Sequence, residues 1–487
     1  MELIPHLDPA SPEALYIQLY RHLRREIEDG RLPAEARLPS VRKLAAHLGV
    51  SRTPVESAYQ QLLAEGYVES RPRSGLTVKP YEPDFERGAD GAPPPSPPRP
   101  DKRTTPLSPS APPVPAGKPE SIDFAYGDVD LTYFPFALWK RLLGECFLPE
   151  HRDLFRYGDP LGEAGFRKAL SAYAYRARAV VCPPERIVVG AGTHHSMEQI
   201  CRLLRQTRYA PGETAFAVEE SMSDGIAAIL RHHGYRLAPI PLEPDGLDIG
   251  ALYESGARLV YVTPSHQFPF GTVMSIGNRR KLLKWAAETG GLIVEDDYDG
   301  EFRYAGLPIP SLQGLDADGS VAYVGTFSRA LAPAFRLSYA ALPPALAQIA
   351  SAALHPFDRL ASPLHQKTLE QFMTGGHMQR HVRKMRSVYQ RKLAALLGAV
   401  RHRLEPRFRA SGGGAGLHVL LQAEGGAGPG EAELIRLAAE AAVRVYPTSV
   451  YRVDPRRPAA EAVLLGFGAL SEAQIAEGVR RLAEAWR

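Results

Sequence analysis

The feature that most constrains the fold of this 487-residue chain is a proline-rich segment near its N-terminus. Between residues 80 and 119, 14 of 40 positions are proline, and the runs PPPSPPRP and SAPPVP lie at its centre. Proline lacks a backbone N–H and fixes φ, so such a segment cannot build a buried core. We therefore expect an extended linker at residues 81–119, which reaches on the order of 100 Å at about 3.1 Å per residue. The chain is predicted to fold as two separate regions, residues 1–80 and residues 120–487.

The N-terminal region has the pattern of three short helices followed by a hairpin. Apolar residues recur at helical spacing from Leu15 to Ile27. The segment VRKLAAHL follows Ser40, and RTPVESAYQQLLAEG follows Ser51; both serines are expected to cap the helices that they precede. YVES and LTV then flank RPRSG, which predicts two short strands around a glycine-containing turn. Two helices separated by GVS predict a helix-turn-helix, and the hairpin predicts a wing.

The run LPSVRKLAAHLGVSRTPVESAYQQLLAEGYVESRPRSG closely resembles the GntR-type winged helix-turn-helix domain. The resemblance implies that double-stranded DNA is a partner, read by the start of the second motif helix in the major groove and by the wing. The expected DNA-binding residues are Arg42, Ser51, Arg52, Thr53, Arg71, Arg73 and Gly75. Residues 31–80 carry a net charge of +4, which suits a phosphate backbone. The alternative is that these arginines are ordinary surface residues.

Residues 121–487 alternate between strands and helices, which is the pattern of a mostly parallel α/β sheet. RIVVGAG predicts a strand, and THHSMEQICRLL predicts a helix that opens directly after Gly192. Free backbone N–H groups at a helix N-terminus attract phosphate. Alone, such a turn is more often a simple strand-to-helix connection.

Two further motifs with polar residues follow predicted strands. In GLIVEDDYDGEF, Asp296 and Tyr298 are two residues apart and are expected on one face, where a carboxylate and a phenol can bind a hydroxypyridine ring. Asp297 is the alternative carboxylate if the register differs. The segment VAYVGTFSRALAPAFRLSYAAL offers two hydroxyls and two guanidiniums, which suit an anion. A salt-bridged strand end and a solvated basic turn are the competing interpretations.

These segments, with YGDPLGEAGFRKAL and VTPSHQFPFGTVMS, resemble fold-type I aminotransferases, and most closely the aminotransferase-like half of MocR-type, GntR-family regulators. The resemblance covers residues 121–487 and implies a site for pyridoxal or pyridoxamine phosphate. The cofactor-binding residues that it implies are Gly192, Thr193, His194, Asp296, Tyr298, Thr326, Ser328, Arg329 and Arg336. In the family, the position of Arg329 is a lysine that holds the cofactor as a Schiff base.

Three departures from the family pattern change the expected chemistry. A Schiff base needs a neutral amine, whereas the Arg329 guanidinium stays protonated. Ser223 stands where an aromatic ring normally helps to line the site, and VLLGFGAL lacks the arginine that holds the substrate carboxylate in classical aminotransferases. We therefore expect no catalytic residue, and a cofactor that is noncovalent if it is bound at all.

The predicted fold is α/β: an N-terminal winged helix-turn-helix at residues 1–80, the linker, and a fold-type I aminotransferase-like body at residues 120–487 with a mostly parallel sheet. The predicted function is a transcriptional regulator that forms a homodimer, binds DNA and senses a small-molecule effector. Two alternatives stay open. One is an active aminotransferase with a DNA-binding head, and the other is a body that serves as a ligand-free dimerisation scaffold.

Composition excludes several other classes of protein. The N-terminus lacks a basic segment followed by an apolar one, and no apolar run approaches the roughly 20 residues of a membrane span. The three cysteines show no zinc-binding spacing. We expect a soluble cytoplasmic protein with no membrane partner and no metal site.

Overall fold

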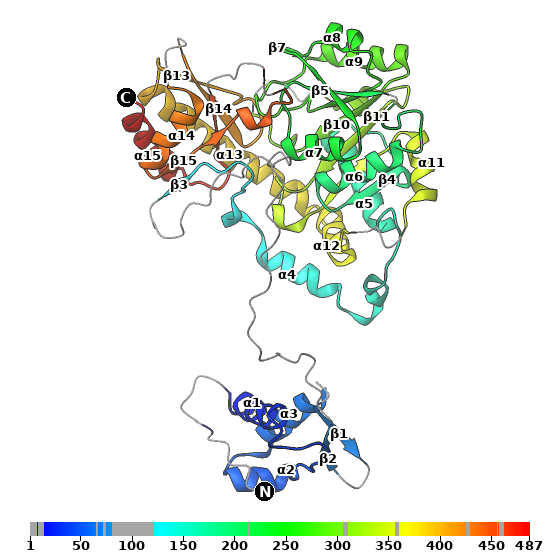
Figure 1. Cartoon of the computed structure of the whole chain (residues 1–487), viewed down its shortest axis with the longest axis vertical. Helices are drawn as coiled ribbons and strands as arrows, with labels where there is room; N and C mark the ends of the chain where they lie inside the picture. Colours follow the sequence, from blue (N-terminus) through cyan, green and yellow to red (C-terminus); the bar gives the residue numbers. More distant parts are fainter. Residues whose placement is uncertain are drawn as a thin grey trace, which may run out of the picture. The chain divides into compact units, whose positions relative to one another are not determined.

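The computed structural model divides by internal contacts into two units, Met1–Pro106 and Leu107–Arg487 (Figure 1). The residues that the structure describes are 7, 14–64, 67–71, 75–79, 121–212, 214–304, 310–355, 360–424, 429–454, 456 and 462–487. The expected linker at 81–119 lies outside them, so its extended conformation and the domain limits stay predictions.

The described part of the first unit contains three helices and a two-stranded hairpin. They are α1 (Leu15–Glu28), α2 (Val41–Leu48), α3 (Arg52–Ala64), β1 (Val68–Arg71) and β2 (Gly75–Val78). As expected, the Ser40 side chain caps α2 by accepting the backbone N–H of Lys43 at 3.3 Å, and Gly49 ends this helix in the left-handed conformation. The strands pair antiparallel, with Val68 opposite Val78. The predicted winged helix-turn-helix fold is therefore confirmed.

The core of this unit lies between α1 and α3. Leu19 and Leu23 of α1 are fully buried, and Ile27 is nearly so, as their helical spacing predicts. Val55 and Leu62 of α3 are also fully buried in the same cluster. Burial of this apolar stripe fixes the position of α3, whose first residues remain at the surface.

The second unit is built around a seven-stranded sheet. In spatial order its strands are β4 (Ile187–Gly190), β12 (Ser338–Ala341), β11 (Val321–Thr326), β10 (Leu292–Asp297), β9 (Leu259–Val262), β5 (Ala215–Glu219) and β6 (Arg236–Ile240). From β11 to β6 neighbouring strands are parallel, while β12 runs antiparallel to β11 and β4. The prediction of a mostly parallel sheet is confirmed.

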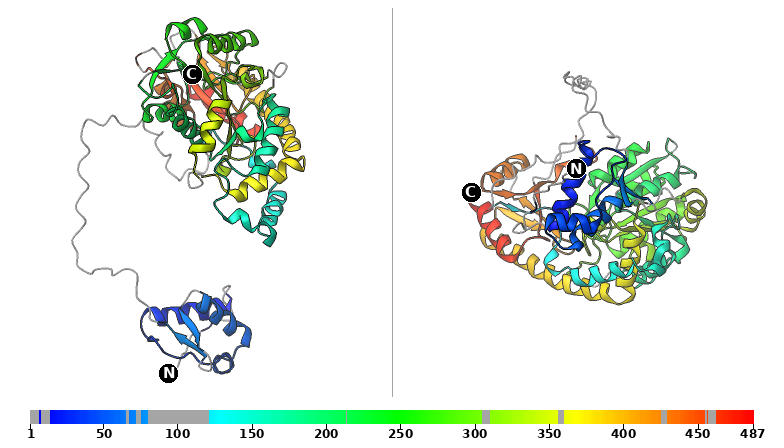
Figure 2. Two further views of the ribbon diagram at one scale, coloured as in Figure 1. Left: turned by 90° about the vertical axis from the view of Figure 1, so that its right-hand side faces the viewer. Right: turned by 90° about the horizontal axis from the view of Figure 1, so that it is seen from below.

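Helices cover both faces of this sheet (Figures 1 and 2). They are α5 (Ala164–Arg178), α6 (Thr193–Leu204), α7 (Asp224–His232), α8 (Ile249–Glu254), α9 (Ile276–Thr289), α10 (Leu312–Leu315), α11 (Pro344–Ala353) and α12 (Pro363–Thr374). Val188 and Val324 pack in one cluster with residues of α6, α7 and α11. Val189 and Tyr323, their neighbours in the strands, pack in another with residues of α5 and α12. Alternate strand residues thus bury opposite faces.

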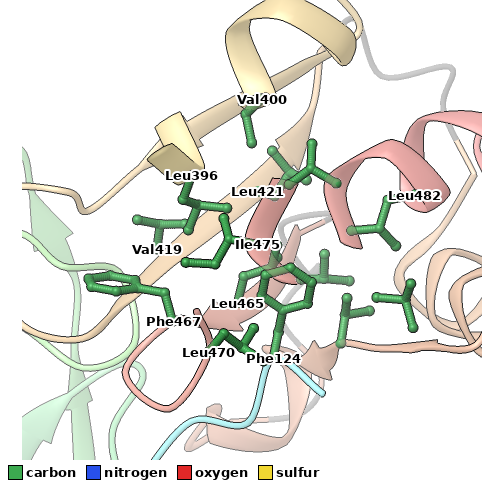
Figure 3. Close-up of a cluster of buried hydrophobic side chains, with 14 of the residues drawn as sticks. Phe124, Leu396, Val400, Val419, Leu421, Leu465, Phe467, Leu470, Ile475 and Leu482 are labelled. Atoms are coloured by element: carbon green, nitrogen blue, oxygen red, sulfur yellow. The ribbon is translucent and has the colours of Figure 1, made fainter. Parts of the chain in front are cut away.

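A smaller lobe contains the C-terminal part of the chain. Its sheet has the order β13 (Phe408–Ser411), β14 (His418–Ala423), β17 (Ala462–Gly466) and β16 (Tyr446–Pro447), and its helices are α13 (His377–Arg403), α14 (Glu431–Glu440) and α15 (Glu472–Ala485). Figure 3 shows the core of this lobe, in which Leu396 of α13, Leu465 of β17 and Ile475 of α15 meet Phe124. The start of the body therefore packs within the C-terminal lobe, where β3 (Ile122–Asp123) pairs with β15 (Val443–Arg444).

Shorter elements connect these parts. They are η1 (Leu131–Tyr133), α4 (Phe136–Glu145), η2 (Pro149–Phe155), η3 (Pro184–Arg186), β7 (Leu242–Glu243), β8 (Gly246–Leu247), η4 (Pro333–Phe335) and η6 (Ser449–Tyr451). No helix in the described part of the chain has the length and apolar character that crossing a lipid bilayer requires.

Candidate functional site

A pocket of about 270 Å³ lies in the body, where the carboxyl ends of β10 and β11 approach the N-terminus of α6. Its lining residues are Tyr126, Gly127, Thr193, His194, Ser223, Ile226, Tyr261, Thr263, Phe268, Asp296, Tyr298, Thr326, Ser328, Arg329, Pro333 and Arg336. The pocket brings together all the residues that the sequence predicted for the cofactor except Gly192, which lies directly against one of them. Ligand sites in open α/β sheets commonly lie at this edge.

One side of the pocket collects donors for an anion. Gly192 precedes α6 with φ of +92°, and an added Cβ there would overlap the Arg336 guanidinium. Glycine is therefore required both by the backbone conformation and by the close approach of Arg336. The hydroxyl of Thr326, the last residue of β11, lies 3.0 Å from that of Ser328 in the turn that follows. A helix N-terminus, a guanidinium and two hydroxyls form an arrangement that can bind a phosphate.

The His194 side chain adds a titratable group to this side. Partial burial and the positive charge of Arg336 lower the pKa of His194. The imidazole is therefore neutral near pH 7, where it can donate or accept a hydrogen bond without adding charge.

The pocket also contains the carboxylate of Asp296, one of whose oxygens has no hydrogen-bond partner in the described part of the chain. The Tyr261 hydroxyl donates to Oδ2 of Asp296 at 2.6 Å. Oδ1 of Asp296 is buried and has no hydrogen-bond partner in the described part of the chain. Burial raises the pKa of Asp296 to about 7. An unpaired buried carboxylate oxygen is costly, and a protonated ring nitrogen would satisfy it.

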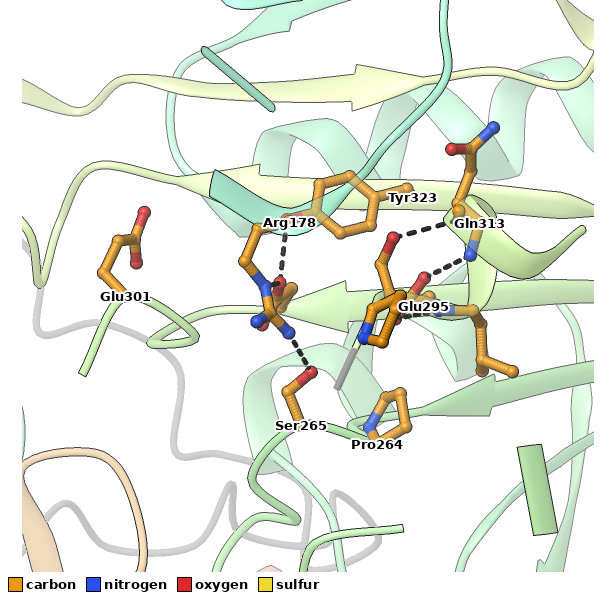
Figure 4. A network of polar contacts seen from close by, with 12 residues as sticks. Arg178, Pro264, Ser265, Glu295, Glu301, Gln313 and Tyr323 are labelled. Atoms are coloured by element: carbon orange, nitrogen blue, oxygen red, sulfur yellow. Dashed lines mark hydrogen bonds and ion pairs between the residues drawn. The ribbon is translucent and has the colours of Figure 1, made fainter. Parts of the chain in front are cut away.

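Asp297 points away from the pocket and is engaged elsewhere. Arg178 donates from Nε to Oδ2 of Asp297 at 2.5 Å. Arg178 also donates from Nη2 to Ser265 at 2.5 Å, a contact that Figure 4 shows. The Tyr323 hydroxyl also donates to Oδ2 of Asp297, at 2.8 Å. Strand alternation therefore places Asp296, and not Asp297, at the pocket.

Tyr298 lies one residue beyond the end of β10, so its position depends on the following loop as well as on strand alternation. Its hydroxyl lies 3.0 Å from Nδ1 of His266, which also lies 2.8 Å from Oδ2 of Asp299. Burial alone would lower the pKa of His266, but the charge and hydrogen bond of Asp299 raise it. This buried pair holds the Tyr298 hydroxyl at the pocket.

The structure adds residues that the sequence prediction left without a role. Tyr261 and Thr263 alternate at the end of β9, and Phe268 follows in the segment VTPSHQFPFG. Strand alternation was the signal that could have identified Tyr261. His266, Asp299 and His418 offer ligand atoms within 4.8 Å of one another. The predicted absence of a metal site stays a prediction.

Arg329 lines the pocket, at the position where the family resemblance predicts a lysine. Its Cζ lies 4.3 Å from the centre of the Tyr126 ring, a cation–π contact, and Gly127 lies alongside. Burial would lower the pKa of Arg329, but the neighbouring Tyr126 and Asp299 raise it, so the guanidinium stays charged. Within the described residues, no lysine lines this pocket.

The other two departures from the family pattern are also visible. Ser223, which stands where the family resemblance predicts an aromatic ring, lines the pocket. The segment VLLGFGAL forms β17 and the turn after it, and Gly466 and Gly468 pack closely against the backbone of residues 125–128. No arginine of the C-terminal lobe lines the pocket in the described part of the chain.

In the N-terminal unit, the predicted DNA-contacting residues lie at the surface where they are described. Arg42 is exposed on α2, and Ser51, Arg52 and Thr53 are exposed at the start of α3. Gly75 opens β2 with φ of +80°. Arg73 and the side chain of Arg71 lie outside the described residues. The DNA contacts themselves stay predictions.

Comparison with known proteins assigns both units. Residues 15–78 match the family described as "Bacterial regulatory proteins, gntR family", and residues 121–482 match "Aminotransferase class I and II". The chain is 38% identical to the HTH-type transcriptional regulator YdeL of Bacillus subtilis over 100% of both chains. It is 32% identical to the regulatory protein MocR of Rhizobium meliloti, over 99% of this chain and 95% of MocR.

Among solved structures, the body is similar to the multiple substrate aminotransferase of Thermococcus profundus. The TM-score is 0.68 at 26% sequence identity, over 76% of this chain and 92% of the aminotransferase. The similarity to enzymes thus covers the body, and the similarity to regulators covers the whole chain.

Proposed function

The chain belongs to the MocR-type GntR family of DNA-binding transcriptional regulators, and from this we propose that its aminotransferase-like body senses a pyridoxal-phosphate-type ligand bound without a covalent bond. The observation that carries the proposal is the position of Arg329. A charged guanidinium lies in the pocket where the aminotransferases use a lysine, and no lysine lines the pocket in the described part of the chain.

The residues of the pocket fit such a ligand. Thr193, Ser328 and Arg336 would hold the phosphate, and Tyr298 would bind the ring hydroxyl. Asp296 would pair with the protonated ring nitrogen, which satisfies the carboxylate oxygen that lacks a partner. When bound, pyridoxal phosphate supplies an aldehyde and an electron-withdrawing ring.

We infer that the protein is not an aminotransferase. Transamination requires a neutral amine that can attack the aldehyde and later exchange protons with the substrate. The guanidinium of Arg329 has delocalised lone pairs and a raised pKa, so it can do neither. Its positive charge instead favours the binding of an anionic ligand. A ligand-free scaffold is the competing proposal. The presence of Asp296, with its unpaired oxygen, in the same pocket as Arg329 and Arg336 argues against it.

We also propose that the protein acts in the cytoplasm as a homodimer on double-stranded DNA. The body exposes aromatic side chains on the segment that includes α4 and η2, among them Phe136, Phe147, Phe155 and Tyr157, which are 57–69% exposed. The rings of Phe147 and Phe155 lie 5.5 Å apart, centre to centre. Exposed aromatic groups are typical of protein interfaces, and a second copy would pair two DNA-binding heads with two half-sites.

Calorimetric titration of the full-length protein with pyridoxal phosphate and pyridoxamine phosphate tests the proposal. We expect saturable binding of at least one vitamer that dialysis reverses, and a change in operator affinity when the site is saturated. If neither vitamer binds, the body is a scaffold. Aminotransferase turnover with any amino donor would contradict the noncatalytic assignment.

A further inference from the structure

The pocket contains two guanidiniums, and that of Arg329 has no carboxylate as a direct partner in the described part of the chain. In the described part of the chain, Arg329 forms no ion pair, and its nearest aromatic group is the Tyr126 ring at 4.3 Å. Asp299, the acid that raises its pKa, is hydrogen-bonded to His266. A partly desolvated guanidinium is costly unless an anion pairs with it. An anion bound beside Arg329 would therefore offset the cost of burying its charge.

This anion is distinct from the phosphate that Arg336 would hold. Arg336 lies against Gly192 at the N-terminus of α6, whereas Arg329 lies against Tyr126 and Gly127. The two guanidiniums thus belong to different walls of the pocket and contact different elements. Two separate cations in one cavity favour a ligand with two separate anionic groups.

We propose that Arg329 binds a carboxylate of the ligand, so that the effector is an amino-acid adduct of a phosphopyridoxyl group. This rests on the proposed function of the pocket. A lysine at this position would bond to the aldehyde carbon, so whatever is joined to that carbon meets Arg329. No arginine of the C-terminal lobe lines the described pocket, which leaves Arg329 to recognise the amino-acid carboxylate.

Tyr126 and Gly127 contact the Arg329 guanidinium and determine where it lies. Tyr126 contacts the guanidinium with its ring and its hydroxyl, which limits the movement of Arg329. A guanidinium has five N–H donors, so it can still bind a planar, two-oxygen acceptor. A Cβ at Gly127 would lie 3.3 Å from Nη1 of Arg329, so glycine gives the guanidinium room in this wall. A lysine ammonium has no such planar pair of donors. The substitution therefore replaces a bond-forming group with a carboxylate-binding one.

The test uses two ligands that differ in one group. N-(5′-phosphopyridoxyl)glycine carries the carboxylate, and N-(5′-phosphopyridoxyl)methylamine lacks it; both are stable secondary amines that cannot form a Schiff base. Calorimetry on the full-length protein should show at least tenfold tighter binding of the glycine adduct. In Arg329→Gln this preference should fall below threefold, because the glycine adduct should lose more affinity than the methylamine adduct does. Arg329→Lys, which keeps a positive charge, should retain part of the preference.

The outcomes separate this inference from the proposed function. Equal affinity of the wild-type protein for both adducts would overturn the role of Arg329 and leave noncovalent binding of the vitamer intact. A preference that survives in Arg329→Gln would also overturn it, because another group would then bind the carboxylate. If neither adduct nor pyridoxamine phosphate binds, the proposed function itself fails. Binding of the methylamine adduct to Arg329→Gln shows that the variant has a folded pocket.

Discussion

Replacing Asp296 by asparagine should stabilise the ligand-free protein and weaken its response to the ligand. The carboxylate is buried, accepts one hydrogen bond from Tyr261 and leaves Oδ1 without a partner in the described structure. Asparagine has nearly the same shape and can still accept from Tyr261, but it carries no charge. The variant therefore removes the ionisation of Asp296 while changing little else.

The size of the effect follows from the pKa of Asp296, which burial raises from 3.8 to about 7. The folded protein then binds a proton more tightly than the unfolded chain does. Below pH 3.8 the acid is neutral in both the folded and the unfolded protein, so its burial has no ionisation cost. As the pH rises from 3.8 toward 7 the unfolded chain ionises first, and the free energy of unfolding falls. At about 1.4 kcal/mol per pKa unit, the ionised group costs up to roughly 4 kcal/mol above pH 7. Repulsion from neighbouring acids contributes to the raised pKa, so part of this cost depends on their own ionisation. We therefore expect Asp296→Asn to raise the free energy of unfolding by about 1–4 kcal/mol at pH 8.

Thermal unfolding between pH 4 and pH 8 measures this difference. Asp296→Asn should melt several degrees higher than the wild-type protein at pH 8, and the difference should shrink toward pH 4. Added pyridoxamine phosphate should stabilise the wild-type protein more than the variant, because only the carboxylate pairs with a protonated ring nitrogen. A variant that is less stable at pH 8, or that responds to the ligand as the wild-type protein does, would refute the role of Asp296.

Three further predictions concern the DNA-binding surface, the phosphate side of the pocket and the dimer. Arg52→Ala should weaken specific operator binding by about 1–3 kcal/mol, measured by fluorescence anisotropy. The control variant Arg25→Ala, at an exposed position on α1, should not weaken it. Equal losses in the two variants would mean that α3 does not read the bases. Arg336→Gln should weaken binding of pyridoxamine phosphate by about 1.5–3 kcal/mol in calorimetry, and an unchanged affinity would remove this residue from the phosphate site. Phe147→Ser with Phe155→Ser should shift sedimentation toward the monomer without changing the circular dichroism spectrum, because both rings are exposed; an unchanged dimer would place the interface elsewhere.

The order of strands and helices could be predicted because local patterns determine them. The buried run LIVEDD and the glycine before Thr193 each mark the end of a strand whatever the rest of the chain does. Alternation along β10 also predicted that Asp296 and Asp297 lie on opposite faces, but the choice between them depended on the register, which the structure supplies by placing Asp296 in the pocket lining. The position of β12, which lies between β4 and β11 and runs antiparallel to both, could not be predicted from a local sequence pattern. It depends on pairing between segments that are distant in the sequence.

The environment of Arg329 could not be predicted for the same reason. Tyr126 lies in a turn just after β3, in a segment without a helical or strand period, and only the packing of the body brings it over the guanidinium. The partners of Asp297 are likewise distant in sequence: Arg178 is on α5 and Tyr323 is on β11. The sequence predicted residues that line the pocket, whereas the residues that position them could be identified only from the fold.

The most direct test of noncovalent binding is reduction with borohydride in the presence of pyridoxal phosphate, followed by intact mass and peptide mapping. The wild-type protein should show no adduct from the pocket, because Arg329 cannot form an imine. Arg329→Lys should gain one phosphopyridoxyl group at position 329 if the pocket binds the vitamer. An adduct in the wild-type protein at any lysine, formed in proportion to the protein and competed by pyridoxamine phosphate, would contradict the account.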